Sequence, residues 1–358
     1  MNEADTGSPG TDRSASWPRR LGVAAIALAA TAALYVAYWM FAAEQVRRGI
    51  DAWIEAKSYE GVSVSYRDLS VDGFPLWLDI RIAGPAALFQ GPSPVEWTTA
   101  GLRARVRPWN WGKVQVDAAG KHEIVGVRRV SLAAQRLSGT FVFGRRGAAT
   151  GRLDAQGVDA DISKAGALRM KALALDFRWR AESGENASPL RFDLGMDDLV
   201  VPPRWATPLG RDVASLRFAG HVTGPLGDHR NPAFLREWRN AGGTIEIARL
   251  AVSHGPLRVE AEGTAALDKA LQPVGAFATR VEGYMETVDA LRQAGIMGAG
   301  DATAAKLVLA VIAKRPNGET PYIAAPLTLQ DRVLSLESLK LAKLRVIDWS
   351  RVLGIPME

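Results

Sequence analysis

The chain of 358 residues contains no cysteine, which excludes disulfide bonds and thiolate metal sites. It also lacks a Gly-x-Ser-x-Gly nucleophile elbow and a phosphate-binding loop. The histidines are few and dispersed, and only His221 and His229 lie near each other. Their spacing does not place two metal ligands on one face of a helix. We therefore expect no catalytic residues, no metal site and no cofactor, and a protein that is not an enzyme.

Blocks of like charge are absent as well. The formal net charge is +6, but the basic residues are scattered along the chain. A nucleic-acid-binding protein gathers its positive charge on one face or in one arm. The sequence thus predicts no nucleic-acid partner, and a solvated surface is the simplest interpretation of the charges.

One long apolar run stands out. Residues Leu21 to Ala43 carry no charge and no proline, and as a helix they would rise about 35 Å, enough to cross a hydrocarbon core of about 30 Å. A cleaved secretory signal is the alternative, but its apolar core is shorter, and Phe41 is too bulky for the −3 position of a cut after Ala43. Tyr35, Tyr38 and Trp39 suit the membrane interface. We predict a retained transmembrane helix over residues 21–43.

The arginines around this run give a small bias in orientation. Arg13, Arg19 and Arg20 precede it, whereas Arg47 and Arg48 follow it. The positive-inside rule therefore favours a cytoplasmic N-terminus by a narrow margin. Residues 1–20 are rich in polar and small residues and are predicted to be a disordered cytoplasmic tail. This places a single-pass protein in the inner (cytoplasmic) membrane, with its C-terminal domain in the periplasm.

Residues 44–60 continue the helical pattern outside the membrane. Val46, Ile50, Trp53 and Ile54 recur at helical spacing with charged residues between them, and Gly61 follows. We expect a juxtamembrane helix here that is continuous with the span.

Beyond Gly61 the apolar residues alternate with polar ones, as in Leu173 to Trp179 and in Leu257 to Ala261. Such alternation indicates strands with one buried and one solvated face, which pair antiparallel. Residues 61–358 are therefore predicted to form a mainly β (α+β) domain, with a large antiparallel sheet that curls or forms a groove.

Few helices are expected in this domain. Residues Pro232 to Asn240 are predicted to form a short helix with Asn231 as its N-cap. A helical insertion is expected at about 286–314. Its second helix, Asp301 to Lys314, should have Asp301 as N-cap and a buried face of four apolar side chains: Leu307, Val308, Val311 and Ile312.

Two ordered motifs resemble a bacterial envelope family called domain of unknown function 2125. The first motif is Gly73, Phe74 and Pro75, followed by an alternating strand. The second consists of Trp238, Gly242 and Gly243, then a strand, then Gly255, Pro256 and Leu257. His254 departs from the family pattern, which has an aromatic residue there. The resemblance implies a membrane-anchored, β-rich envelope protein with no assigned reaction. From the residues alone, these glycines and prolines are expected to form turns between strands.

Eleven tryptophans are present, several of them in the β-rich region. Large aromatic side chains fill a thin β core, or they line an apolar groove. The leading hypothesis is a non-catalytic envelope protein that binds lipid or lipid-linked material in an apolar β groove. The alternative is a periplasmic protein–protein interaction or scaffold module that holds no small molecule.

Overall fold

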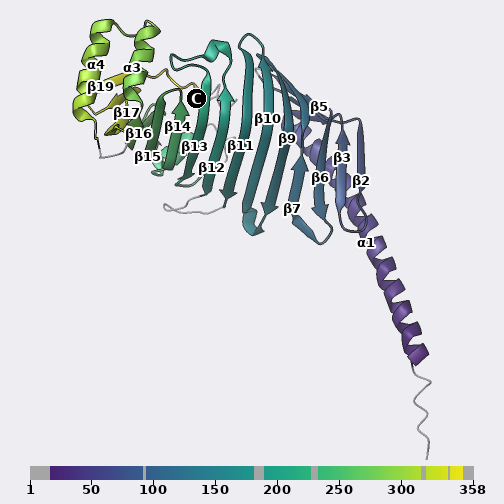
Figure 1. The fold of residues 1–358 in the computed structure, drawn as a ribbon. Helices are drawn as coiled ribbons and strands as arrows, with labels where there is room; N and C mark the ends of the chain where they lie inside the picture. Colours follow the sequence, from purple (N-terminus) through teal and green to yellow (C-terminus); the bar gives the residue numbers. More distant parts are fainter. Residues whose placement is uncertain are drawn as a thin grey trace, which may run out of the picture.

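The described part of the chain opens with one long helix. The computed structural model describes residues 17–91, 94–180, 189–226, 233–315, 320–337 and 339–349. Helix α1 (Trp17–Tyr59) is continuous through both predicted helical segments (Figure 1). It includes residues 17–20, because a proline is tolerated in the first helical turn, where no amide partner is lost. Residues 1–16 of the predicted tail lie outside the described residues. By length and composition, α1 is able to cross a membrane.

The remainder of the described chain is dominated by one antiparallel sheet of 19 strands. The strands before the long body of the sheet are β1 (Val62–Ser65), β2 (Asp68–Asp72), β3 (Leu78–Ala83), β4 (Ala86–Phe89), β5 (Val95–Thr99), β6 (Gly101–Arg107), β7 (Asn110–Asp117) and β8 (Gly120–Val125). The body consists of β9 (Arg129–Phe143), β10 (Ala149–Ile162), β11 (Gly166–Trp179), β12 (Leu190–Val200), β13 (Asp212–Val222), β14 (Ile245–His254), β15 (Leu257–Leu267), β16 (Pro273–Glu282), β17 (Tyr322–Gln330), β18 (Val333–Leu336) and β19 (Leu339–Lys343).

Strand β9 is the branch point of the sheet. One of its edges pairs with β10 along the whole strand, and its other edge pairs with β8 at residues 129–134 and with β7 at residues 138–142. Two arms therefore diverge from β9. The β1 arm runs β8–β5–β4–β1, and the β2 arm runs β7–β6–β3–β2. From β9 to β19 each strand pairs with the next, and the sheet does not close on itself. The predicted mainly β, antiparallel fold class is confirmed.

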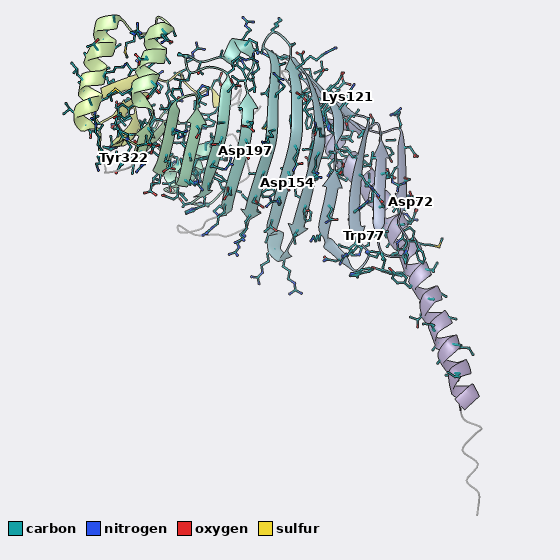
Figure 2. All side chains as sticks on the ribbon, viewed as in Figure 1. Asp72, Trp77, Lys121, Asp154, Asp197 and Tyr322 are labelled. Atoms are coloured by element: carbon teal, nitrogen blue, oxygen red, sulfur yellow. The ribbon has the colours of Figure 1, made fainter. Side chains whose placement is uncertain are left out.

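The sheet has one apolar face and one polar face. Directly opposed residues of an antiparallel pair share a face, so the register traces each face from strand to strand. The apolar face of the body includes Leu137, Phe141, Leu153, Leu173, Phe177, Phe192, Leu194, Met196, Phe218, Leu250, Val252 and Val259. The polar face includes Arg152, Asp154, Asp176, Arg178, Arg191, Asp193, Asp197, Arg217 and Glu260 (Figure 2).

The alternation changes phase partway along several strands. Ala155 and Val158 are both buried in one cluster on the apolar face, although they are three residues apart. The intervening Gly157 has a φ of +57°, and on β12 Asp198 has a φ of +50°. A left-handed residue of this kind turns the strand so that the apolar side chains return to the same face.

Three helices accompany the later strands. Helix α2 (Phe234–Asn240) ends where predicted, and it begins after Ala233, whereas the predicted cap and start, Asn231 and Pro232, lie outside the described residues. Helices α3 (Tyr284–Gln293) and α4 (Ala299–Ile312) form the helical insertion. They lie at the end of the sheet opposite α1 (Figure 1). Two short 3₁₀ turns, η1 (Arg145–Gly147) and η2 (Pro203–Trp205), complete the described elements.

The details predicted for α4 are wrong. Gly298, and not Asp301, occupies the N-cap position, and Asp301 lies inside the first turn. The four apolar side chains that were expected to face inward are all exposed. Instead Leu309 and Ala313 pack against the cluster around Tyr284 and Ile323. Almost every position of this helix is apolar or small, so its sequence does not determine which face is buried.

Among the described helices, α1 and the pair of α3 and α4 cover the apolar face at its two ends, while α2 packs Trp238 at the connection between β13 and β14. At one end, Ala42 and Ala43 of α1 pack with Val71, Leu78 and Val106 from the β2 arm. At the other, Tyr284 of α3 and Leu309 of α4 pack on β16 and β17. The residue pairs Val114–Phe141 and Val281–Ile323 place both clusters on the same face of the sheet. The core is thus a row of separate clusters on one surface.

Because these clusters are separate, damage to one should stay local. Leu78 is 0% exposed at the contact between α1 and the sheet. We expect Leu78→Ala to cost about 2–5 kcal/mol of local stability, as for other buried leucines. Amide hydrogen exchange should accelerate in β2, β3 and β6 but not in β11 to β13.

The matched control is Leu88→Ala on β4, where the leucine side chain is 38% exposed. Leu88→Ala should accelerate amide hydrogen exchange far less than Leu78→Ala does. Uniform acceleration across all strands in Leu78→Ala would show that the sheet unfolds as one cooperative unit instead.

Candidate functional site

The main candidate is the part of the apolar face that no helix covers. Within the described residues, α1 packs against β1 and β2, and α3 packs against β15. Between these ends, β9 to β14 form a single layer whose apolar side chains are half-buried by their own neighbours. A continuous apolar surface of this kind on a protein usually marks a contact with another molecule or a membrane.

Aromatic rings shape this surface. Phe141 lies 6.3 Å from Phe177, and Phe192 lies 4.9 Å from Phe218, measured between ring centroids. Phe177 lies over Gly151, whose Cβ, if it had one, would come 2.3 Å from the ring. Small residues beneath the rings let them lie flat on the sheet. The result is a smooth hydrocarbon surface that offers ring faces and leucine side chains.

The opposite face is polar and internally paired. Arg152 contacts both Asp154 and Asp176 at 3.0 Å, and Arg217 contacts Asp197 at 2.5 Å. A shallow hollow of about 380 Å³ lies among Thr140, Arg152, Asp176, Arg178, Arg191 and Asp193. Three arginines and two aspartates line it, so its surplus of positive charge is a single unit. These groups support solubility more readily than recognition of a charged ligand.

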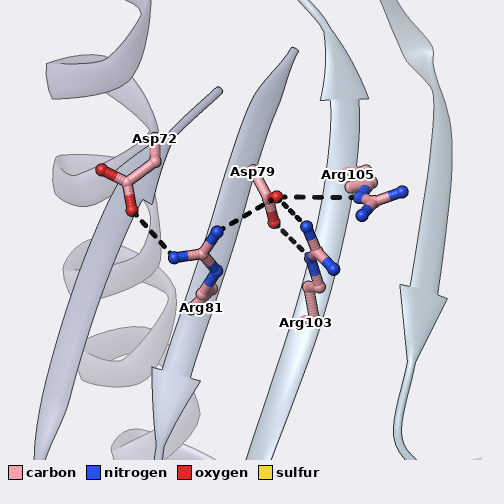
Figure 3. A network of polar contacts seen from close by, with 5 residues as sticks. All are labelled: Asp72, Asp79, Arg81, Arg103 and Arg105. Carbon is pink, nitrogen blue, oxygen red and sulfur yellow. Dashed lines mark hydrogen bonds and ion pairs between the residues drawn. The ribbon is translucent and has the colours of Figure 1, made fainter. Parts of the chain in front are cut away.

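One carboxylate on the polar face of the β2 arm has three arginine neighbours (Figure 3). Asp79 on β3 accepts two hydrogen bonds from Arg103 on β6, one of them 2.7 Å long. Arg81 and Arg105 approach the same carboxylate at 3.6 and 3.7 Å. The hydrogen bonds from Arg103 hold the pKa of Asp79 below its ordinary value, although burial acts in the opposite direction. This network binds β3 to β6 directly behind the contact with α1.

The first predicted motif lies against α1. Gly73 has a φ of +97° in the turn between β2 and β3, and the Phe74–Pro75 peptide bond is cis. Phe74 lies 5.7 Å from Trp39 and 6.2 Å from Tyr35, measured between ring centroids. The hydroxyl of Tyr35 donates to the carbonyl of Pro75. The motif therefore forms the turn expected of it, and the structure adds a partner on α1.

The second motif is a tight corner around one indole. Trp238 of α2 is buried and donates its Nε1–H to the carbonyl of Thr223 at 2.7 Å. Gly243 lies directly beneath the ring, and a Cβ at this position would come 2.3 Å from Trp238 Cε2. Gly242 has a φ of +74° and completes the turn into β14. These residues act together as a structural joint between α2 and the sheet.

Gly255 and Pro256 form the turn between β14 and β15, and Leu257 opens β15 opposite His254. His254 is buried, and its ring nitrogens lie 2.6 Å from Thr207 Oγ1 and 3.0 Å from the carbonyl oxygen of Asp212. His254 thus uses both nitrogens within the fold, at the position where the family pattern has an aromatic residue. The two predicted motifs are not brought together; they lie at different ends of the sheet.

The other histidines are placed in a similar way. His122 is buried, stacks on Trp97, and its Nε2 lies 2.6 Å from the carbonyl oxygen of Ala118. His221 is on β13, and His229 lies outside the described residues. Across the described ranges, no group of three histidine, aspartate or glutamate side chains is arranged to hold a metal ion.

Sequence reasoning did not identify two features. The Asp79 network depends on the pairing of β3 with β6, which are not adjacent in the chain. The contacts between α1 and two turns of the β2 arm also join distant segments. The alternating Arg103, Arg105 and Arg107 were a visible signal of a basic strand face, but not of its partner.

Comparison with known proteins gives one match. A family model described as "Uncharacterized protein conserved in bacteria (DUF2125)" matches residues 39–345. No curated protein matches the chain, and no solved structure does.

The close approach of Gly243 to Trp238 predicts a steric effect. Gly243→Ala should displace the indole and cost about 1–3 kcal/mol, in the range of overpacked cores. Thermal unfolding followed by near-UV circular dichroism would measure the change. Gly300→Ala on α4 is the control, because a Cβ there meets nothing within 4 Å. It should leave stability unchanged or slightly raised, and equal losses in both variants would contradict the assigned role of Gly243.

The low pKa of Asp79 predicts a pH dependence. The pKa of an aspartate in an unfolded chain is about 3.9. Because the folded-state pKa is lower, the carboxylate stabilises the fold fully above that value, and this contribution is lost as the pH falls through the folded-state pKa. Asp79→Asn should therefore lower the melting temperature at pH 7, and the difference from wild type should shrink below about pH 4.

Asp72→Asn provides the comparison, since Asp72 is exposed and its ion pair within this network is with Arg81, at 3.4 Å. Its effect should be small at every pH. A loss in Asp79→Asn that stays constant between pH 3 and pH 7 would mean that the ionised carboxylate is not the source of the stability.

Proposed function

We propose a function for this chain, which belongs to the DUF2125 family of bacterial proteins. It is a non-catalytic, membrane-anchored envelope protein whose apolar face holds acyl chains of lipid or lipid-linked material. In this proposal α1 spans the inner membrane and the β domain lies in the periplasm. The slight excess of arginine before the apolar run supports this orientation.

The observation that carries the proposal is the uncovered stretch of the apolar face from β9 to β14. Five strand spacings of about 4.8 Å give it a length of about 24 Å across the strands. One leaflet of a hydrocarbon core is about 15 Å thick. An extended acyl chain therefore fits along this stretch with room to spare.

The chemistry of the face favours hydrocarbon over a polar ligand. A site for a polar small molecule combines an apolar lining with a few convergent polar groups. The charged side chains of the body lie on the opposite face, where arginines and aspartates pair with one another. Acyl chains need no such groups, and they would remove the ring faces of Phe177 and Phe192 from water.

The position of the face relative to α1 points in the same direction. Val114 packs against the buried cluster that contains Ala42 and Ala43 of α1, and it pairs with Phe141 on β9. The apolar surface is therefore continuous from α1 to the body of the sheet. If α1 spans the membrane, the uncovered stretch begins next to the bilayer. A lipid would then reach the sheet without crossing the polar face.

Site-specific photocrosslinking would test this proposal. With p-benzoylphenylalanine in place of Phe192, the full chain in phosphatidylethanolamine and phosphatidylglycerol nanodiscs should crosslink to phospholipid, which mass spectrometry would detect. The same group in place of Asp193, the next residue but on the polar face, should not. Because the two residues are adjacent, the control probe lies on the same strand and at nearly the same distance from the bilayer.

Two results would count against lipid. Equal crosslinking at both positions would mean that the probe reports random contact with the bilayer. Crosslinking of Phe192 in cells to one protein, with no lipid adduct, would favour the protein–protein scaffold module instead.

A further inference from the structure

Two turns of the β2 arm hold α1 in an aromatic collar, which we define as Phe74, Leu76, Trp77, Trp109 and Trp111. The turn between β2 and β3 supplies the first three, the turn before β7 supplies Trp109, and Trp111 is the second residue of β7. Phe74, Leu76 and Trp109 are each more than half exposed, although they are large and apolar. Exposed side chains of this kind, gathered around one helix, call for a partner.

Helix α1 supplies hydrogen-bond donors to three backbone carbonyls of the two collar turns. Besides the bond from Tyr35 to Pro75, the hydroxyl of Tyr38 donates to the carbonyl of Pro108 at 2.5 Å. Trp39 Nε1 donates to the carbonyl of Trp77 at 3.0 Å. Turn carbonyls normally need water. Here three of them have donors from α1, which lowers the cost of placing these turns in a medium that is poor in water.

The collar lies at a definite height on α1. Arg20 is the last charged residue before the apolar run. From Arg20 to Trp39 the helix rises about 28 Å at about 1.5 Å per residue, close to the thickness of a hydrocarbon core. With Arg20 at one membrane surface, the contacts at Tyr35 to Trp39 fall at the other surface.

The composition of the collar matches that surface. Tryptophan and tyrosine prefer the headgroup region, where a ring meets hydrocarbon on one side and water on the other. The guanidinium of Arg107 lies over the Trp77 ring at 4.9 Å and adds a positive charge beside it. This charge suits anionic headgroups.

We infer that the aromatic collar is a second membrane contact, in which Phe74, Leu76 and Trp109 enter the headgroup and upper acyl region around α1. The inference rests on α1 spanning the bilayer, as proposed above, but not on lipid binding along β9 to β14. Its consequence is that the β domain is held against the membrane surface in one orientation instead of swinging on a flexible tether.

Because the chain has no cysteine, single-cysteine variants carry a spin label at one chosen site. Full-length Leu76→Cys and Trp109→Cys would be compared in nanodiscs of phosphatidylcholine and phosphatidylglycerol. Electron paramagnetic resonance gives the ratio of collision rates with oxygen and with a water-soluble nickel chelate, which rises with depth in the bilayer. Leu28→Cys reports the span itself.

The water control is Val127→Cys, in the hairpin between β8 and β9. Val127 is 87% exposed and lies at the end of β9 away from the collar, about 46 Å away for 14 strand residues. The expected order of the ratio is Leu28 highest, Leu76 and Trp109 intermediate, and Val127 lowest.

The outcomes separate the collar from its premise. A high ratio at Leu28 with values at Leu76 and Trp109 equal to that at Val127 would overturn the collar inference and leave the anchor intact. A low ratio at Leu28 would overturn the span, and the collar inference with it. A ratio at Trp109 equal to that at Val127, with an intermediate ratio at Leu76, would place only the turn between β2 and β3 in the membrane. That result would contradict the inference as stated.

Discussion

The structure depends on how one continuous apolar face of a sheet is kept from water. A single layer of strands has no second sheet to pack against, so each part of its apolar face needs its own cover. Helix α1 supplies that cover at one end, where Ala42 and Ala43 pack between apolar residues of the β2 arm, and α3 with α4 supply it at the other. The small side chains of those two alanines let the helix lie close to the strands.

Much of this architecture follows from alternation, and some of it does not. The strands from Leu173 to Trp179 and from Leu257 to Ala261 show period two, and they lie in the sheet as predicted. The alternation of β9 breaks between Ala134 and Leu137, where its second edge passes from β8 to β7. The branching was still not predictable, because β10 shows the same kind of break without branching. Which strands share its second edge depends on how the arms pack around α1. Gly157 and Asp198, where the alternation changes phase, look like ordinary loop residues in the sequence.

The candidate sites divide in the same way. Gly73 to Pro75 and Gly242 to Gly243 were predictable as turns, because glycine and proline there have few other structural uses. Their partners were not predictable, since Tyr35 and Trp39 lie more than thirty residues before the first motif. For α4 the sequence was misleading: Leu307 and Val308 are as apolar as Leu309, yet only Leu309 packs inward. Apolar composition without a polar stripe leaves the rotation of a helix to its neighbours.

The continuity of α1 links these observations. A helix that runs unbroken from Trp17 to Tyr59 transmits its own tilt to whatever is fixed to it from its middle onward. The β2 arm is fixed there by buried apolar packing, by three hydrogen bonds to turn carbonyls and, one layer behind, by the Asp79 network. The sheet and the first half of α1 therefore move as one body. In a membrane, the direction in which the uncovered apolar face points would be determined by the helix and the aromatic collar, and not by a linker.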